Sequence, residues 1–512
     1  MLHSFFAVFE RVSGGSENRL TEMLLAKNGN FDIIRYNVHT EEVFLLRKGD
    51  KNFMPDFRKN KGATRAKIRV KRSPTQIIAL TFGLIILAGT LLLMLPVASR
   101  SGVSCGFRPA LFTATSATCV TGLVLYDTWT QWSGFGQTVI LLMIELGGLG
   151  FMSAASMVVF LLRKKIGLRQ RMLMAQALSV NEMEGVVRLQ KWVLLGSLII
   201  QFTGAAILFL RFLPDYGLKT AVTWGVFHAV SAFCNAGFDI VGSVAPGANM
   251  IFFNNDPVVC VTLMALILVG GLGFFVWEEV ATVRSFKKFS VYTKLVLIGS
   301  AVLLLGGAAL ILLLEWNNPG TLGAMPVPQK ILNAFFQSVT VRTAGFAAVD
   351  QAALTDGGKA VSILLMLIGG ASGSTAGGIK LVTVLVLVLF VAARARGRSS
   401  VNVFCRRIPD DKVMDAMTIA SIVVGLSVLG AIAICATSKV SFLDSLYETV
   451  SALATVGLSA GVTGSLSIPA QFMIILFMYF GRVGVLTISL GFLMGDKAAE
   501  RFRYAHTNLL IG

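Results

Sequence analysis

Residues 226–240, VFHAVSAFCNAGFDI, are too polar for a membrane span and too apolar for a solvent loop. Three other stretches share this character: 110–128, ALFTATSATCVTGLVLYDT; 334–350, AFFQSVTVRTAGFAAVD; and 446–462, LYETVSALATVGLSAGV. The four stretches align on one glycine each, namely Gly122, Gly237, Gly345 and Gly457. Six residues before these glycines stand Ser116, Ser231, Val339 and Ser451. The spacing of 115, 108 and 112 residues reveals an internal repeat, which determines the fold.

The composition places the chain in a membrane. It has 512 residues, of which 55% are hydrophobic and 14% are charged, and its mean hydropathy is +0.74. Soluble proteins contain about 25% charged residues, whereas a helix that crosses a bilayer needs about 20 apolar residues. Eight segments are expected to span the membrane: 76–98, 137–162, 192–213, 257–283, 293–314, 359–393, 413–437 and 470–494.

Basic residues set the expected orientation in the membrane. The formal net charge is +18, and the excess lies in the N-terminal region and in clusters that border apolar segments. With eight spans, both termini and the clusters at 163–171, 284–294, 394–412 and 497–503 fall on one side. The positive-inside rule makes that side the cytoplasm. This distribution indicates contact with membrane lipid and argues against a nucleic-acid partner.

Each repeat is expected to contain a long helix, a short re-entrant helix, a glycine strand and a second long helix. We call the first long helix M1, the re-entrant pore helix P and the second long helix M2. The fold class is therefore an all-α membrane protein with four parallel M1–P–M2 repeats. Eight transmembrane helices and four re-entrant pore helices would surround one pore in a pseudo-fourfold arrangement. The expected parts are a basic cytosolic N-terminal tail (1–73) and repeats D1 (74–172), D2 (173–288), D3 (289–400) and D4 with the C-terminal tail (401–512).

The N-terminal tail contains one amphipathic pattern. Leu2, Phe5, Phe6, Phe9 and Val12 recur at helical spacing. They predict a short helix, lying either in the membrane interface or against the cytosolic face of the protein.

The repeated glycine strands fit a cation-selective filter. Four short helices aimed inward place their C-terminal ends, which carry partial negative charge, near a common axis. Rings of backbone carbonyls that replace a hydration shell select potassium, and glycine allows the backbone conformations they require. The expected potassium ligands are Cys119, Val120, Thr121, Gly122, Cys234, Asn235, Ala236, Gly237, Arg342, Thr343, Ala344, Gly345, Ala454, Thr455, Val456 and Gly457.

The segment GGASGSTAGGIK, residues 369–380, interrupts an apolar run in the third repeat. A phosphate-binding loop is excluded, because Ile379 separates Gly378 from Lys380 and no Ser or Thr follows the lysine. Instead, glycine doublets recur in the last helix of each repeat, and their second positions align as Gly148, Gly271, Gly370 and Arg482. A buried charge at that depth needs a partner, and the carbonyls and hydroxyls of the interrupted helix are its natural neighbours.

We therefore expect a gate below the filter, formed by a loop of the third repeat and held partly by Arg482. Its residues are Gly369, Gly370, Ala371, Ser372, Gly373, Ser374, Thr375, Ala376, Gly377, Gly378, Lys380 and Arg482.

Several charged side chains need a different explanation. Arg342 would repel a cation, so its side chain is expected to point behind the filter, where Glu448 is a candidate partner. Glu145 could belong to a structural pair or to a pore vestibule. Asp127 could concentrate cations outside the pore or be a solvated loop acid. The cysteines lack metal-ligand spacing, and no nucleophile–base pair or His/Glu metal cluster indicates an enzyme.

The motifs TCVTGL, CNAGF, VRTAGF and ATVGLS resemble the four filter loops of the Trk/Ktr/HKT superfamily of potassium transporters. The resemblance covers residue 74 to the C-terminus and is greatest to the membrane subunits of Ktr systems. Plant HKT sodium transporters often have serine at the position of Gly122, so glycine there favours potassium. The interrupted helix resembles the intramembrane gating loop of the family, and Arg482 matches its arginine in the last helix.

The resemblance implies potassium uptake across a bacterial inner membrane, with sodium dependence left open. It also implies a homodimer and a cytosolic, nucleotide-binding regulatory subunit of the RCK type. A sodium- or proton-coupled cation symporter of the same fold is the alternative.

Overall fold

The structure, a computed structural model, describes residues 10–13, 20–27, 30–37, 42–46, 74–150 and 186–484. The chain divides into two compact units, Met1–Lys71 and Arg72–Gly512. Each unit is described by itself.

The N-terminal unit contains an antiparallel sheet that the sequence analysis did not predict. Its strands are β1 (Glu10–Ser13), β2 (Leu20–Lys27), β3 (Asn30–Asn37) and β4 (Glu42–Leu46), in the order β1-β2-β3-β4. Lys27 pairs with Asn30, and the two residues between them are Asn-Gly, the strongest short hairpin signal. The expected amphipathic helix is wrong at Val12, which lies in β1, and its other four residues lie outside the described residues.

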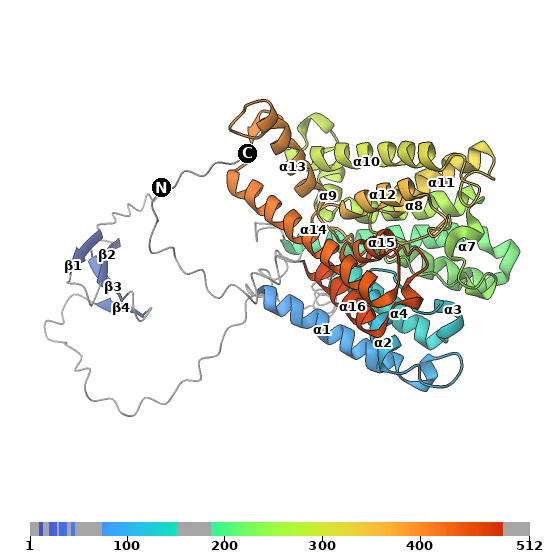
Figure 1. The fold of residues 1–512 in the computed structure, drawn as a ribbon. Coiled ribbons are helices and arrows are strands. Elements are labelled where there is room, and N and C mark those ends of the chain that lie inside the picture. The colour runs from blue at the N-terminus through green and yellow to red at the C-terminus, as the bar shows by residue number, and fades with distance from the viewer. Residues whose placement is uncertain are drawn as a thin grey trace. The chain divides into compact units, whose positions relative to one another are not determined.

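The second unit is helical (Figure 1). The described residues up to 283 contain α1 (Pro74–Leu93), α2 (Phe107–Thr118), α3 (Thr128–Gln131), α4 (Gly134–Gly148), α7 (Val186–Phe233), α8 (Pro257–Gly271) and α9 (Phe274–Val283). The rest contains α10 (Val291–Glu315), α11 (Val327–Thr340), α12 (Asp356–Leu367), α13 (Leu381–Ala395), α14 (Asp410–Ser438), α15 (Phe442–Leu453) and α16 (Ile468–Val483). Short 3-10 turns are η1 (Pro96–Ala98), η2 (Val241–Ser243), η3 (Asn249–Phe253), η4 (Phe286–Lys288) and η5 (Thr463–Ser465), and β5 (Asn402–Val403) pairs with β6 (Arg406–Arg407).

Side-chain oxygens cap the first turn of seven of these helices, namely the four-residue α3, which Asp127 caps, and six longer helices. An N-cap oxygen accepts a hydrogen bond from an otherwise unpaired N–H of the first turn. The caps are Ser133 on α4, Asp256 on α8, Ser290 on α10, Thr355 on α12, Ser441 on α15 and Ser467 on α16.

Within the described residues, four helical segments are long and apolar enough to cross a membrane: Gln76–Leu93, Val187–Phe233, Val291–Glu315 and Asp410–Ser438. A fifth is added if α8 and α9 form one span, while α4, α13 and α16 are apolar but shorter. The protein is therefore a multi-pass membrane protein by length and composition. The expected spans 137–162 and 470–494 extend beyond the described residues, so the count of eight remains a prediction.

Two expected spans are not continuous helices. The expected span 257–283 breaks between α8 and α9, which meet at an angle of 94°. The expected span 359–393 is interrupted between α12 and α13. By contrast, α7 joins the third expected span to the second pore helix, with a kink at Gly217, whose φ is 74°.

The helices pack in an order that closes on itself. Long helices contact the short helices that follow them, α1 with α2, α10 with α11 and α14 with α15, and the two halves of α7 contact each other where Phe212 packs on Trp224. Each short helix also contacts the last helix of the preceding repeat, as α11 does with α8 and α15 does with α12. The first repeat follows the same rule, because α2 packs against α16 at the far end of the chain (Figure 1).

Candidate ion pathway

Four short segments follow directly on α2, α7, α11 and α15. We call them the glycine segments, residues 119–122, 234–237, 342–345 and 454–457, and all but Gly457 are fully buried. In each segment φ is positive at the glycine and again two residues earlier. Positive φ is uncommon for a non-glycine residue and an outlier for a β-branched one. It nevertheless recurs at Val120 (56°), Asn235 (59°), Thr343 (67°) and Thr455 (52°), so the four segments share one backbone conformation.

The glycine segments contact one another in a closed ring. Each glycine faces the carbonyl oxygen of the residue that precedes the glycine of the next segment. A Cβ atom added to Gly122 would lie 2.5 Å from the carbonyl oxygen of Ala236. The same close approach continues around the ring, from Gly237 to Ala344 (2.7 Å), from Gly345 to Val456 (2.5 Å) and from Gly457 back to Thr121. Only glycine fits at these contacts.

Serine hydroxyls support the first and fourth glycine segments in the same way. The N–H of Gly122 donates to Oγ of Ser116 over 3.0 Å. The N–H of Gly457 donates to Oγ of Ser451 over 3.0 Å. These are the serines that the sequence repeat aligns six residues before the glycine, and they give an otherwise unpaired buried N–H its partner.

The second and third segments use their hydroxyls as donors. Ser231 Oγ donates to the carbonyl of Phe238 over 2.8 Å. The third repeat has Val339 at the aligned position, and the next residue, Thr340, donates to the carbonyl of Phe346 over 2.6 Å. Sequence alignment missed Thr340 because it lies one position out of register with the other three.

Arg342 is buried, and among the described residues it does not pair with Glu448. Glu448 Oε1 instead accepts a hydrogen bond from Thr463 within its own repeat. Arg342 lines a small cavity together with Asn235, Gly271 and Gly370, and its Nε has no partner among the described residues. The expected pairing of Arg342 with Glu448 was wrong because the loop after the fourth glycine segment returns Thr463 to Glu448, a contact that no spacing in the sequence reveals.

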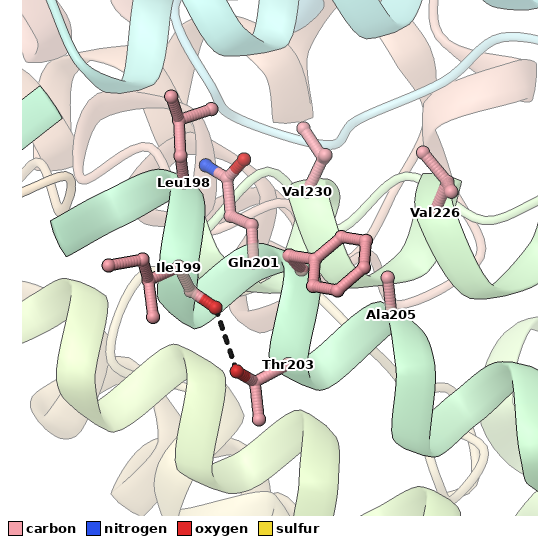
Figure 2. Close-up of a pocket in the computed structure, with 8 residues that line it drawn as sticks. Leu198, Ile199, Gln201, Thr203, Ala205, Val226 and Val230 are labelled. Atoms are coloured by element: carbon pink, nitrogen blue, oxygen red, sulfur yellow. Dashed lines mark hydrogen bonds between the residues drawn. The ribbon is translucent and has the colours of Figure 1, made fainter. Parts of the chain in front are cut away.

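Glu145, on α4, accepts hydrogen bonds from Gln201 of α7. Gln201 Nε2 donates to its two carboxylate oxygens over 3.2 and 3.0 Å, and Cys234 Sγ lies 3.4 Å from its Oε2. Gln201 comes from α7, where it lines a cavity of about 490 Å³ together with Leu198 and other apolar side chains (Figure 2). The carboxylate therefore contacts the second glycine segment from outside the ring.

The interruption between α12 and α13, residues 368–380, is called the glycine loop. Its two ends pair through a bridge between Ile368 and Ile379, and the N–H of Gly369 donates to the carbonyl of Ile379 over 2.8 Å. A Cβ on Gly378 would lie 3.3 Å from Cβ of Ala454. The loop is thus a closed structure that lies against the fourth glycine segment.

Arg482 joins the glycine loop to the first repeat. Its Nη1 donates to the carbonyl oxygen of Thr375, and its Nη2 donates to those of Gly147 and Gly148. The contact with the loop is the one expected from the aligned depth of the glycine doublets. Lys380, a second cation of the loop, donates to the carbonyl of Ala376 over 2.6 Å. Both cations are therefore satisfied by carbonyl groups.

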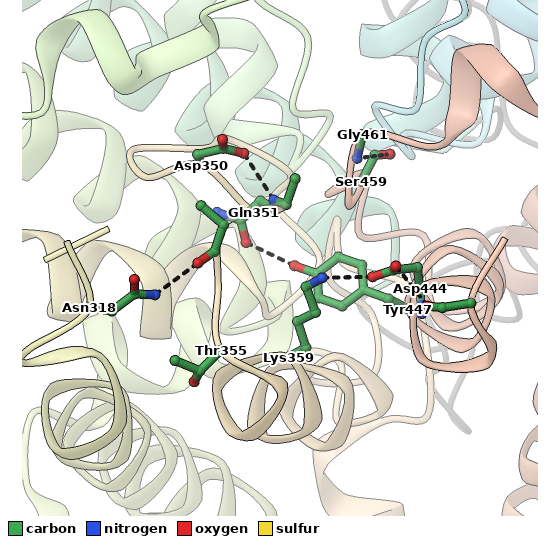
Figure 3. A network of polar contacts seen from close by, with 12 residues as sticks. Asn318, Asp350, Gln351, Thr355, Lys359, Asp444, Tyr447, Ser459 and Gly461 are labelled. Carbon is green, nitrogen blue, oxygen red and sulfur yellow. Dashed lines mark hydrogen bonds and ion pairs between the residues drawn. The ribbon is translucent and has the colours of Figure 1, made fainter. Parts of the chain in front are cut away.

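A polar network that sequence analysis missed ties α12 to α15 (Figure 3). Lys359 Nζ donates to Oδ1 of Asp444 over 2.7 Å. Tyr447 donates to Oε1 of Gln351 over 2.8 Å, and Gln351 also bonds with Gln337. This network anchors α12, the helix that leads into the glycine loop. The bonded residues are far apart in the sequence, so no sequence pattern predicts which of them pair.

Two acids lie beyond the glycine segments. Asp127 accepts hydrogen bonds from the N–H groups of Thr130 (2.8 Å) and Gly247 (3.1 Å). Asp239, in the loop between α7 and η2, accepts one from Val241 over 3.2 Å. Burial, and then the nearby negative charge of Asp127, raise the pKa of Asp239 to about 7. The described residues hold no group of three or more metal-ligating side chains.

Solved structures show a similar fold. The potassium transporter TrkH from Vibrio parahaemolyticus superposes with a TM-score of 0.65 over 85% of this chain and 87% of that one, at 18% identity. This similarity supports a mostly helical transporter fold and nothing finer.

Sequence comparisons show the family. Residues 56–501 match the family TrkH, cation transport protein. The chain is 40% identical to Ktr system potassium uptake protein B of Bacillus subtilis, over 85% of this chain and 96% of that protein. It is 37% identical to the potassium/sodium uptake protein NtpJ of Enterococcus hirae, over 87% and 99%. These relatives are transporters, which supports a function other than catalysis. The chain therefore belongs to the TrkH family of cation transport proteins.

Proposed function

We propose that the protein takes up potassium ions across the bacterial inner membrane through a filter formed by the four glycine segments. The observation that carries this proposal is the closed ring of glycines, each against the carbonyl oxygen before the next glycine. Carbonyl rings of this kind replace the hydration shell of a potassium ion. The names of the relatives, which are potassium uptake proteins, support the same ion.

The ligands would come from the sixteen residues of the glycine segments, mainly from their backbone. Side chains at the first position, such as Cys234 and Arg342, contact neighbouring repeats instead. The packing order of the helices supports four parallel M1–P–M2 repeats around one pore, with the divisions given above. Both termini would then be cytoplasmic.

The glycine loop would be the gate of this pathway, and Arg482 would help to hold it closed. The loop lies against the fourth glycine segment, and Arg482 bonds it to the first repeat.

Partners follow from the same proposal. We expect a homodimer in the membrane, regulated by a cytosolic nucleotide-binding subunit of the RCK type, and the names of relatives as proteins of a Ktr system support a partner subunit. Sodium would serve as a coupling ion if uptake is sodium-dependent.

A sodium- or proton-coupled symporter of the same fold is the second candidate. The relative named a potassium/sodium uptake protein favours it.

One experiment tests the proposal and separates these candidates. The protein is expressed in a bacterium deficient in potassium uptake, and growth is measured at low potassium. Purified protein in liposomes is then tested for flux of potassium, rubidium and sodium. We expect rescue of growth and potassium flux that exceeds sodium flux. A folded protein that carries only sodium, or neither ion, would refute potassium uptake.

A further inference from the structure

The second repeat contains a break that the filter and gate do not explain. α8 ends at Gly271 and α9 begins at Phe274, with an angle of 94° between them. In a continuous α-helix each carbonyl accepts a hydrogen bond from the N–H four residues later. The carbonyls of Gly270 and Gly271 would then bond to Phe274 and Phe275. The break removes these bonds, and the backbone groups that they leave need other partners.

The glycine loop supplies the missing partners. Three backbone hydrogen bonds join it to the break: Thr375 N–H to Gly270 (3.2 Å), Ala371 N–H to Gly271 (3.0 Å) and Phe274 N–H to Gly373 (2.9 Å). A fourth carbonyl, that of Val269, accepts from Trp277 Nε1 over 2.9 Å instead of from Gly273. The loop therefore bonds to two of the carbonyls, and to the first N–H of α9, that a straight helix would pair internally.

The contact between loop and break is close on every side. Tyr292, in the first turn of α10, donates from its hydroxyl to the carbonyl of Ser372 over 3.0 Å. Ala371 is buried in a cluster with Val276 of α9. A Cβ on Gly273 would lie 3.0 Å from the carbonyl oxygen of Ser372. The break, α9 and Tyr292 together form a fitted seat for the loop.

We infer that the glycine loop and the break between α8 and α9 are two parts of one switch. When the loop leaves its seat, α8 and α9 straighten into one helix that pairs Gly270 and Gly271 internally. When the helix bends, the loop returns and takes over these bonds. The inference rests on the proposed role of the loop as the gate, and it adds a mechanism by which gating is coupled to another repeat.

Exchange of partners explains why the two movements occur together. A loop that left alone would strand three buried backbone groups, which native structures rarely tolerate. Straightening pairs the carbonyl of Gly270 with the N–H of Phe274 and the carbonyl of Gly271 with the N–H of Phe275, so the three groups of the break regain partners. Gly273 allows both states, since its φ of 91° in the bent state is accessible to glycine, which also tolerates a helix.

Straightening of the bend would also move residues that are expected on the cytosolic side. α9 has ten residues and is about 15 Å long. Near its end Glu279 accepts hydrogen bonds from the N–H and hydroxyl of Ser290, the cap of α10. Straightening of α9 would therefore move this junction, next to the basic residues Lys287 and Lys288.

Gly273→Ala is the primary test. Alanine resists the left-handed backbone of the bent state, favours a continuous helix and places its Cβ against the loop. We expect potassium flux in liposomes to rise about tenfold, the usual scale of such a backbone penalty. The matched control is Gly150→Ala, two residues after the aligned doublet of the first repeat. Its φ is 82°, but its Cβ would meet no atom of the described residues within 4 Å, so flux should remain at the wild-type level.

A distance measurement tests whether α8 and α9 straighten. Spin labels at Val283, near the end of α9, and Val302, on the exposed face of α10, give their separation by pulsed EPR after Cys105, Cys405 and Cys435 are replaced by serine. We expect Gly273→Ala to shift this distance distribution and Gly150→Ala to leave it unchanged. Tyr292→Phe, which removes one hydroxyl from the seat, should shift it in the same direction and raise flux several-fold.

The outcomes separate this inference from the proposed gate. Higher flux with an unchanged distance in both Gly273→Ala and Tyr292→Phe overturns the coupling and leaves the gate intact. A shifted distance with unchanged flux also overturns it. If deletion of residues 371–377 leaves potassium flux unchanged in folded protein, the gate itself fails. Flux and distance that change together in both variants support the switch.

Discussion

Arg482 donates a hydrogen bond from Nη2 to the carbonyl oxygen of Gly148 over 2.9 Å. Gly148 is the last residue of α4, so its carbonyl has no partner within that helix. A cation at the C-terminal end of a helix is also favoured by the helix dipole. The same guanidinium bonds to Thr375 of the glycine loop. One side chain therefore satisfies a helix end in the first repeat while it holds a loop of the third.

We predict that Arg482→Ala raises potassium flux. The substitution leaves the carbonyls of Thr375 and Gly148 without this partner and removes the positive charge from the pathway, and each lost bond to a charged group is worth about 1.5–3 kcal/mol. Flux in liposomes should increase at least several-fold. Arg482→Lys keeps the charge but lacks the rigid planar fork whose separate nitrogens bond to the two carbonyls, so intermediate flux is expected. Equal or lower flux in folded Arg482→Ala protein would argue against a gate held by this residue.

We predict that Gly122→Ser reduces the preference for potassium over sodium. A Cβ at Gly122 would lie 2.5 Å from the carbonyl oxygen of Ala236, so this carbonyl must move from its place in the ring. The measurement is the ratio of potassium to sodium flux in liposomes. Gly102→Ser is the control, because its φ of 71° gives similar backbone strain but no atom lies within 4 Å. An unchanged ratio in Gly122→Ser would contradict a role of the ring in selectivity.

Much of the ring could be predicted from sequence because it depends on local backbone. The conformation of each glycine segment is fixed by a few adjacent residues that recur at one spacing, so Gly122, Gly237, Gly345 and Gly457 align without a structure. The contact of Arg482 with the loop followed from the same alignment. In a protein built from repeats, equivalent positions that are far apart in the sequence can be aligned from the local motif around each of them.

Contacts that differ between repeats could not be predicted. Glu448 bonds to Thr463 rather than to Arg342, and the break at Gly273 is satisfied by a loop about 100 residues away in sequence. A run of apolar residues cannot distinguish a straight helix from a bent one whose bonds are completed by another segment. The β2–β3 hairpin, by contrast, has a local signal, because Asn-Gly between Lys27 and Asn30 favours a tight turn.

We predict that Glu145→Ala weakens the second glycine segment, whereas Glu145→Gln does not. Alanine leaves Gln201 and Cys234 without their shared acceptor, at a cost of about 1–3 kcal/mol. Glutamine keeps an oxygen that can accept from Gln201. The alanine variant should show a lower melting temperature and a lower preference for potassium in flux assays. If the glutamine variant loses potassium flux as strongly, the charge of Glu145 is what matters, and a vestibule role is favoured.

We predict that potassium uptake rises between external pH 6 and 8 because of Asp239. The pKa of this group is raised to about 7, so it is mostly protonated at pH 6 and mostly charged at pH 8. A carboxylate beyond the filter attracts cations and increases their rate of entry, and this effect is weakened by salt. Initial uptake rates at low potassium should therefore increase several-fold over this range at low ionic strength, and less at high ionic strength. Asp239→Asn, which is uncharged at every pH, should show the low rate throughout. A variant that keeps the wild-type pH dependence would assign the titration to another group.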